Sequence, residues 1–129
     1  FGFIALNSCT IDDDNGANYD YEFLPIESVD IPEEFIFGET YSINYTYYRP
    51  STCHNFFDLY YSVENNQRTV AVINIVYDQS DCELLNEELM ERSFNFTVLD
   101  QQTYVFKFWQ GQSETGEDLY LTYEVPVVE

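Results

Sequence analysis

The chain has 129 residues, with 24 Asp and Glu against 4 Lys and Arg, which gives a formal net charge of −20. So few basic side chains exclude nucleic-acid binding and charge-driven attachment to anionic lipid, because both need Lys and Arg to face phosphate. The composition does not support a disordered chain either, since hydrophobic residues make up 45% and aromatic residues 19%, enough for the core of one domain.

Residues 1–8 are apolar and then small, which is typical of the end of a secretion signal, and the run is too short to span a bilayer. Leu6-Asn7-Ser8-Cys9 resembles the bacterial lipobox, in which the Cys is diacylated and becomes the new N-terminus. The resemblance implies that residues 1–8 are a signal-peptide remnant and that a lipid on Cys9 holds the protein on a membrane. The alternative is a buried N-terminal strand with a free Cys.

Residues 9–20 are polar, acidic and without periodicity, which predicts a tether between the lipid and the domain. Asp12, Asp13 and Asp14 follow closely behind Cys9. Such an acidic cluster resembles the signal that sends lipoproteins of Bacteroidota to the outer face of the outer membrane. The resemblance implies an outer-membrane, lipid-anchored protein that is exposed at the cell surface.

From residue 21 onward, apolar and polar residues alternate with a period of two, as in Tyr41, Ile43 and Tyr45, which indicates half-buried antiparallel strands. Turn-forming residues separate most of these stretches. We predict seven strands, at residues 21–31, 40–48, 55–63, 68–77, 91–98, 103–110 and 119–127. Seven short strands at this spacing indicate an all-β protein, an antiparallel β-sandwich that occupies residues 21–129.

One segment has helical spacing. Leu85 and Leu89 lie four residues apart within the stretch from Cys82 to Met90. This spacing predicts a short helical turn between the fourth and fifth strands, which would cover one end of the sandwich.

Residues 100–106, with the sequence DQQTYVF, resemble the immunoglobulin E–F corner, where a Tyr hydroxyl bonds to upstream backbone. Asp100 and Tyr104 match the corner, whereas Phe106 stands where immunoglobulins have a Cys. The resemblance implies an Ig-like sandwich without the core disulfide, and the alternative is an ordinary strand that carries a Tyr. Residues 21–128 also resemble small surface lipoproteins of Bacteroidota whose function is uncharacterised.

Cys53 and Cys82 lie in the loops after the second and fourth predicted strands. If the strands alternate up and down, both loops lie at one end of the sandwich, so we expect a disulfide, which export permits. Closing a loop of about 30 residues is worth roughly 3–4 kcal/mol. The alternatives are two free thiols or a metal pair, for which only His54 is nearby. We expect no metal and no other cofactor.

Catalytic groups are scarce in this sequence. The only His, His54, directly follows Cys53, and adjacent residues on extended chain usually point apart, so a Cys–His dyad is not expected. Neighbouring acids such as Glu87 and Glu88 are expected to be solvated charge rather than a glycosidase pair. We therefore expect a protein that is not an enzyme.

The acids gather at the end of the sandwich that holds the two cysteines. Besides those of the tether, the acids at this end are Asp78, Asp81, Glu83, Glu87, Glu88, Glu91, Glu114, Glu117 and Asp118. Such an end could hold a divalent cation or attract a basic partner. We favour a solvated surface that keeps the protein soluble.

Four aromatic residues fall opposite the expected core positions: Tyr48, Phe56, Tyr60 and Trp109. Rings flanked by Asp and Asn suit the stacking of sugars, and the alternative is that they stabilise the sheet as cross-strand pairs. The sequence thus predicts a lipid-anchored, non-enzymatic binding or structural module at the cell surface, with a glycan or a protein as ligand. The alternative functions are a carbohydrate-binding accessory lipoprotein of a glycan-uptake system and a protease inhibitor on an Ig-like scaffold.

Overall fold

A computed structural model describes residues 18–129 of the chain. The predicted signal-peptide remnant, the lipidation of Cys9 and the tether as far as residue 17 lie outside the described residues. The described part consists of β-strands, turns and loops and contains no helix. It accordingly has no helix that could cross a membrane.

One sheet has three antiparallel strands, in the order β3-β5-β8. They are β3 (Ile26–Asp30), β5 (Thr40–Tyr48) and β8 (Leu89–Thr97). The alternation in β5 explains its placement, because Ile43, Tyr45 and Tyr47 are buried, whereas Ser42 before them and Asn44 between them are exposed.

The second sheet has five strands, and β7 (Gln67–Tyr77) lies at its centre. Along one edge of β7 runs β6 (His54–Glu64), with which it forms a hairpin. Two strands share its other edge, β2 (Tyr19–Leu24) opposite residues 72–77 and β9 (Tyr104–Gln112) opposite residues 67–70. The strand β10 (Asp118–Val125) pairs with the far side of β9.

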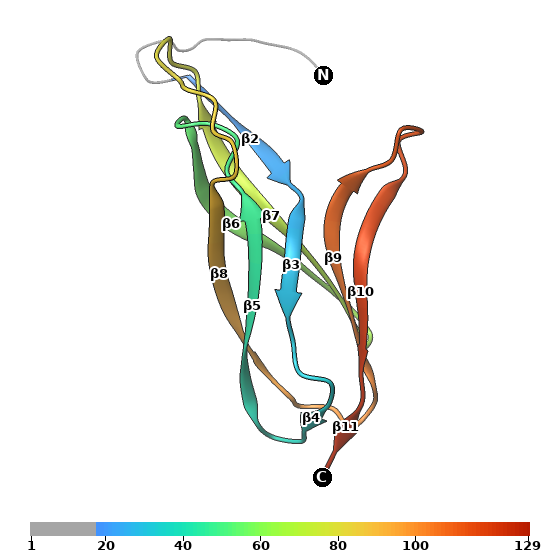
Figure 1. The fold of residues 1–129 in the computed structure, drawn as a ribbon. Helices are drawn as coiled ribbons and strands as arrows, with labels where there is room; N and C mark the ends of the chain where they lie inside the picture. The colour runs from blue at the N-terminus through green and yellow to red at the C-terminus, as the bar shows by residue number, and fades with distance from the viewer. Residues whose placement is uncertain (1–17) are drawn as a thin grey trace, which may run out of the picture.

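A short parallel pair, β4 (Phe35–Ile36) and β11 (Val127–Val128), lies at the end of the molecule that holds the C-terminus. At the opposite end Figure 1 shows the β5–β6 and β7–β8 loops together, and the tip of the β9–β10 hairpin points the same way. The strands from β5 to β10 therefore alternate up and down, which is the condition under which the sequence predicted that both cysteine loops share one end.

The inner faces of both sheets contribute to one hydrophobic core. Its largest fully buried side chains are Ile26, Phe35, Ile43, Tyr45, Tyr47, Val70, Val72, Val98, Tyr104, Phe106, Phe108 and Val125. Phe35 stands out because its ring contacts four others, those of Tyr41, Phe96, Tyr104 and Phe106. It thereby closes the core at the end near the C-terminus.

The all-β prediction is confirmed, and five predicted strands match β5, β6, β7, β8 and β9 to within about two residues. The count of seven is wrong, because two predicted strands are each divided in two and because β4 lies in a stretch where the sequence predicted no strand. The stretch 21–31 divides at Pro25 into β2 and β3, which join different sheets, and the stretch 119–127 divides at Pro126 into β10 and β11. Proline has no N–H to donate to a sheet, so it ends the pairing at both places.

The predicted helical turn from Cys82 to Met90 is wrong. Leu84 forms an isolated bridge with Ser51, and Leu89 already begins β8. Two backbone bonds hold the segment extended along the β5–β6 loop, from Thr52 N–H to the Glu83 carbonyl (3.0 Å) and from Leu85 N–H to the Pro50 carbonyl (2.9 Å). Two leucines four residues apart are too weak a signal to outweigh this pairing.

The pairing of β7 with β9 is parallel, so the prediction of a wholly antiparallel sheet is wrong at this position. In an immunoglobulin sheet, strand C pairs with strand F. Their counterparts in chain order here are β6 and β9, which are not paired. Here the turn of the β6–β7 hairpin docks on the start of β9 instead. The N–H of Val105 donates to the carbonyl of Asn66 (3.0 Å), and the Asn66 side-chain amide donates to the carbonyl of Thr103 (3.2 Å).

Candidate binding surfaces

The predicted disulfide between Cys53 and Cys82 is confirmed, with their Cα atoms 5.5 Å apart. It joins the β5–β6 loop to the β7–β8 loop and encloses the whole β6–β7 hairpin. Because Cys53 is oxidised and buried, it offers no nucleophile. His54 is occupied as well, since its Nε2 lies 2.8 Å from a Glu22 carboxylate oxygen and its Nδ1 lies 2.7 Å from the Ser51 hydroxyl.

The E–F corner residues have the geometry that their resemblance implies. The hydroxyl oxygen of Tyr104 accepts a hydrogen bond from the N–H of Asp100 at 2.9 Å, and the carboxylate of Asp100 accepts one from the N–H of Gln102 at 3.2 Å. Tyr104 is 1% exposed, and the guanidinium of Arg68 lies 5.2 Å from the centre of its ring. The corner therefore fixes the start of β9 and presents no surface to a ligand.

The outer side of the five-stranded sheet carries most of the exposed rings. In β2 the period of two points Leu24 into the core, so that Tyr19, Tyr21 and Phe23 point away from it. These three side chains are 51%, 52% and 49% exposed. Because these rings are about half exposed to water, they contribute little to the hydrophobic core. The core contact of β2 is made by Leu24, on its inner face.

Rings from neighbouring strands extend this row across the sheet. Ring centres lie 6.4 Å apart for Tyr19 and Tyr77 and 4.6 Å apart for Tyr21 and Phe57. Phe23 lies 6.0 Å from Tyr60 on one side and 6.0 Å from Trp109 on the other. We call this surface the aromatic face, and it comprises Tyr19, Tyr21, Phe23, Phe57, Tyr60, Tyr77, Trp109 and Tyr120.

The aromatic face is hollowed where β2, β6, β7, β9 and β10 meet. The hollow has a volume of about 260 Å³, and its aromatic lining comes from Phe23, Tyr60, Trp109 and Tyr120. Polar groups stand beside these rings. The indole N–H of Trp109 and the side-chain amide of Gln112 both donate to one carboxylate oxygen of Asp118, at 3.1 and 3.2 Å. The bond to Asp118 fixes the orientation of the indole ring.

The structure brings together two of the four aromatic residues that the sequence singled out, Tyr60 and Trp109, with Phe23 between them. Tyr48 is 44% exposed, but it lies at the end of β5 in the other sheet. Phe56 does not face outward, because it packs against the core beneath the guanidinium of Arg92, 3.5 Å from its ring centre. A bulge between Phe56 and Asp58 shifts the alternation and exposes Phe57 instead.

Sequence reasoning missed the contribution of β2 to this face. The signal was present, because Tyr19, Tyr21 and Phe23 alternate with Asp20 and Glu22. It was hidden by assigning residues 9–20 to the tether and by treating residues 21–31 as one continuous strand. Pairing of Tyr19 with Tyr77 shows that β2 already belongs to the sheet at residue 19.

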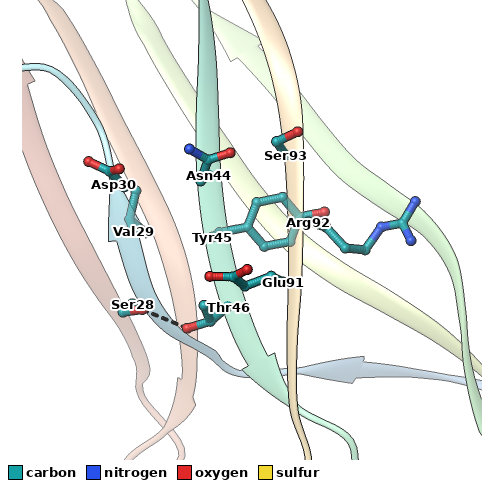
Figure 2. Close-up of a pocket in the computed structure, with 9 residues that line it drawn as sticks. All are labelled: Ser28, Val29, Asp30, Asn44, Tyr45, Thr46, Glu91, Arg92 and Ser93. Atoms are coloured by element: carbon teal, nitrogen blue, oxygen red, sulfur yellow. Dashed lines mark hydrogen bonds between the residues drawn. The ribbon is translucent and has the colours of Figure 1, made fainter.

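The outer side of the three-stranded sheet is polar by contrast. Figure 2 shows its shallow hollow, which has a volume of about 440 Å³ and exposes Ser28, Asp30, Asn44, Thr46, Glu91 and Ser93. The hydroxyls of Ser28 and Thr46 are bonded to each other at 2.6 Å. The guanidinium of Arg92 points away from these side chains and forms no ion pair with Asp30 or Glu91.

The acidic end was a candidate for binding a cation. Among residues 18–129, no group of three or more His, Cys, Asp or Glu side chains is placed to hold a metal ion. The comparisons with protein families, with curated proteins and with solved structures find no match to this chain. The surfaces described above are therefore what bears on its function.

Proposed function

We propose that the chain is a non-enzymatic binding module of the β-sandwich class, held by a lipid on Cys9 at the surface of the outer membrane, with the aromatic face as its binding surface. The lipobox resemblance of Leu6-Asn7-Ser8-Cys9 and the acids behind it support the lipid anchor and the tether. The sandwich follows from two sheets whose inner faces share one core. The Ig-like character rests on the corner at Tyr104 and is limited by the parallel pairing of β7 with β9.

One observation carries the proposal. Five aromatic side chains that are at least 43% exposed lie together on one side of one sheet: Tyr19, Tyr21, Phe23, Phe57 and Tyr60. Single exposed apolar residues are ordinary on protein surfaces, but a contiguous apolar patch marks an interaction site. Aromatic residues are also those that contribute most to binding per residue, because a large rigid ring loses little conformational entropy.

A glycan is the ligand class that the hollow favours. A sugar offers apolar C–H groups on the face of its ring and hydroxyls at its edge. The hollow offers the matching arrangement, with the rings of Trp109 and Tyr60 as platforms and the side chains of Gln112 and Asp118 at the border. The charge of −20 favours a neutral sugar over an acidic one. Such a module would serve as the accessory lipoprotein of a glycan-uptake system.

The binding test uses the whole chain on an array of neutral glycans, followed by calorimetric titration of each positive glycan. We expect Trp109→Ala and Tyr60→Ala to weaken binding about tenfold or more, since truncating an aromatic residue at the centre of a binding surface costs about 2 kcal/mol or more. Tyr48→Ala is the matched control, because Tyr48 is equally exposed on the other sheet. A blank array would rule out the glycan, and equal loss in the control would rule out the aromatic face.

The anchor has its own test. The protein expressed with its signal in a Bacteroidota host should fractionate with the outer membrane, and a Cys9→Ala form should be released from it. External protease should digest the wild-type protein on intact cells. A Cys9→Ala form that stays with the membrane would refute the lipid anchor and leave the aromatic face untouched.

A further inference from the structure

A third concavity lies between the two sheets, near the disulfide. It has a volume of about 140 Å³, and its lining includes Tyr47, Arg49, His54, Asn74, Met90 and Arg92. The chain has only four Lys and Arg residues and one His. Three of these five basic side chains thus line one small cavity in a protein of charge −20.

Among the described residues, the two guanidiniums in this cavity have no carboxylate partner. Within residues 18–129 the one ion pair joins His54 to Glu22, and no carboxylate oxygen comes within 4.0 Å of Arg49 or Arg92. The chain has six acids for every Lys or Arg, yet within residues 18–129 neither of these two positive charges forms an ion pair.

Neutral groups hold both guanidiniums in place. The Nε and Nη2 groups of Arg49 donate to the carbonyls of His54 and Thr52 at 2.6 and 3.0 Å. Arg92 lies over the ring of Phe56, and Figure 2 shows it leaving β8 on the side away from the polar hollow. Because these contacts fix geometry without cancelling charge, the two groups are prearranged for an anion.

Asn74 adds an unpartnered polar group to the same lining. Its side chain is 0% exposed, and neither its amide nitrogen nor its amide oxygen has a hydrogen-bond partner. Nearly all buried polar groups in native proteins are bonded, so a buried amide with both ends free is unusual. The Asn74 amide nitrogen can therefore donate, and its amide oxygen can accept, a hydrogen bond beside the two guanidiniums.

The pKa of Tyr47 is affected by both arginines of the cavity. Burial raises the pKa of its hydroxyl above 10.0, whereas Arg92 and Arg49 both act to lower it. Both positive charges therefore reach the same hydroxyl. His54 adds no free nitrogen, because Glu22 and Ser51 occupy its two ring positions.

We propose that this cavity binds a small organic acid, whose carboxylate pairs with Arg49 and Arg92 and whose hydroxyl or amino group bonds to Asn74. The volume limits the ligand to about six non-hydrogen atoms, because a cavity of about 150 Å³ holds one benzene molecule. The size of a hydroxy acid such as lactate matches this limit. The site is distinct from the aromatic face, since Asn74 points to the inner side of β7 and that face lies on the outer side.

The test follows lactate binding to the whole 15N-labelled chain by NMR at constant ionic strength, with acetate and chloride as anions that lack a donor. We expect lactate to shift the side-chain amide signals of Asn74 saturably. Acetate should bind several-fold more weakly. Arg92→Gln should weaken lactate binding about tenfold or more, because a hydrogen bond to a charged group is worth about that much.

Two further variants make the outcome decisive. Arg68→Gln removes an arginine outside the cavity and should leave lactate affinity unchanged. Asn74→Leu keeps the side-chain volume and should reduce lactate binding to the level of acetate without loss of folding. The proposal is overturned if lactate gives no saturable shift, if acetate and chloride shift the same signals equally, or if Arg68→Gln loses as much affinity as Arg92→Gln. Trp109→Ala, which tests the aromatic face, should not alter lactate binding.

Discussion

Replacing Tyr104 with Phe removes one oxygen atom from the E–F corner and keeps the ring in place. That oxygen accepts the N–H of Asp100 at 2.9 Å, four residues upstream. The ring itself is 1% exposed, and it contacts Phe35, Phe96 and Phe106 in the core. Because Phe retains these contacts, any loss of stability in the variant reports the hydrogen bond.

The expected loss follows from the burial of the pair. A hydrogen bond of this kind contributes about 1 kcal/mol net, and leaving a partly buried N–H without a partner costs more than replacing both groups. We therefore expect the free energy of unfolding to fall by about 1–2 kcal/mol. For a domain of this size, that corresponds to a fall in Tm of roughly 4–10 °C.

Urea unfolding followed by fluorescence and circular dichroism measures the difference directly. Tyr48→Phe is the matched control, because the Tyr48 side chain is 44% exposed, and it should change the free energy of unfolding by no more than about 0.5 kcal/mol. If Tyr104→Phe is as stable as this control, the corner bond contributes nothing and the comparison with the immunoglobulin corner loses its physical basis.

Three other changes test separate parts of the fold. The double variant Cys53→Ala, Cys82→Ala should lower the free energy of unfolding by about 3–4 kcal/mol in guanidinium chloride, because the disulfide closes a long loop, and a loss below about 1 kcal/mol would contradict this account. Gly111→Ala should lower the free energy of unfolding by about 1 kcal/mol or more, since Gly111 has φ +100° and an added methyl would also contact Pro25. An unchanged urea midpoint would show that the backbone at residue 111 can adopt another conformation without cost. Burial raises the pKa of Tyr47 above its unfolded value of 10.0, so the folded chain keeps that proton to higher pH. Its contribution to stability is complete below pH 10 and is lost as pH rises through the folded-state pKa. The alkaline fall in stability should be smaller in Tyr47→Phe, as measured by urea midpoints across pH, and an equal fall would be inconsistent with a raised pKa.

The sequence predicted strand positions well wherever one face of a strand packs on the core. The stretch 40–48 coincides with β5, because Ile43, Tyr45 and Tyr47 leave only one register that buries all three. The cysteines added a long-range constraint, since an up-and-down order had to bring Cys53 and Cys82 to the same end. Local periodicity and one topological rule were therefore enough for most of the framework.

The parts that the sequence did not predict depend on single residues or on distant contacts. The bulge at Phe57 reverses the exposure of two adjacent aromatic residues, and nothing in the local pattern distinguishes Phe56 from Phe57. The position of β9 beside β7 depends on contacts of Asn66 with Thr103 and Val105, almost forty residues away. The cavity at Asn74 draws on four strands or their loops, so no stretch of sequence indicates it.

Three of the four Lys and Arg side chains contact aromatic rings and form no ion pair with a described acid. Lys107 lies 4.4 Å from the ring centre of Tyr120, Arg68 lies 5.2 Å from that of Tyr104, and Arg92 lies 3.5 Å from that of Phe56. The π-face of a single aromatic ring attracts a cation without neutralising its charge. The acids are then not paired with these cations and can hold water around the domain. We propose that the net charge of −20 then keeps the domain hydrated, and that specific contacts are made at the two proposed sites. One is the aromatic face, whose rings are exposed, and the other is the cavity, where Arg49 and Arg92 have no carboxylate partner among the described residues.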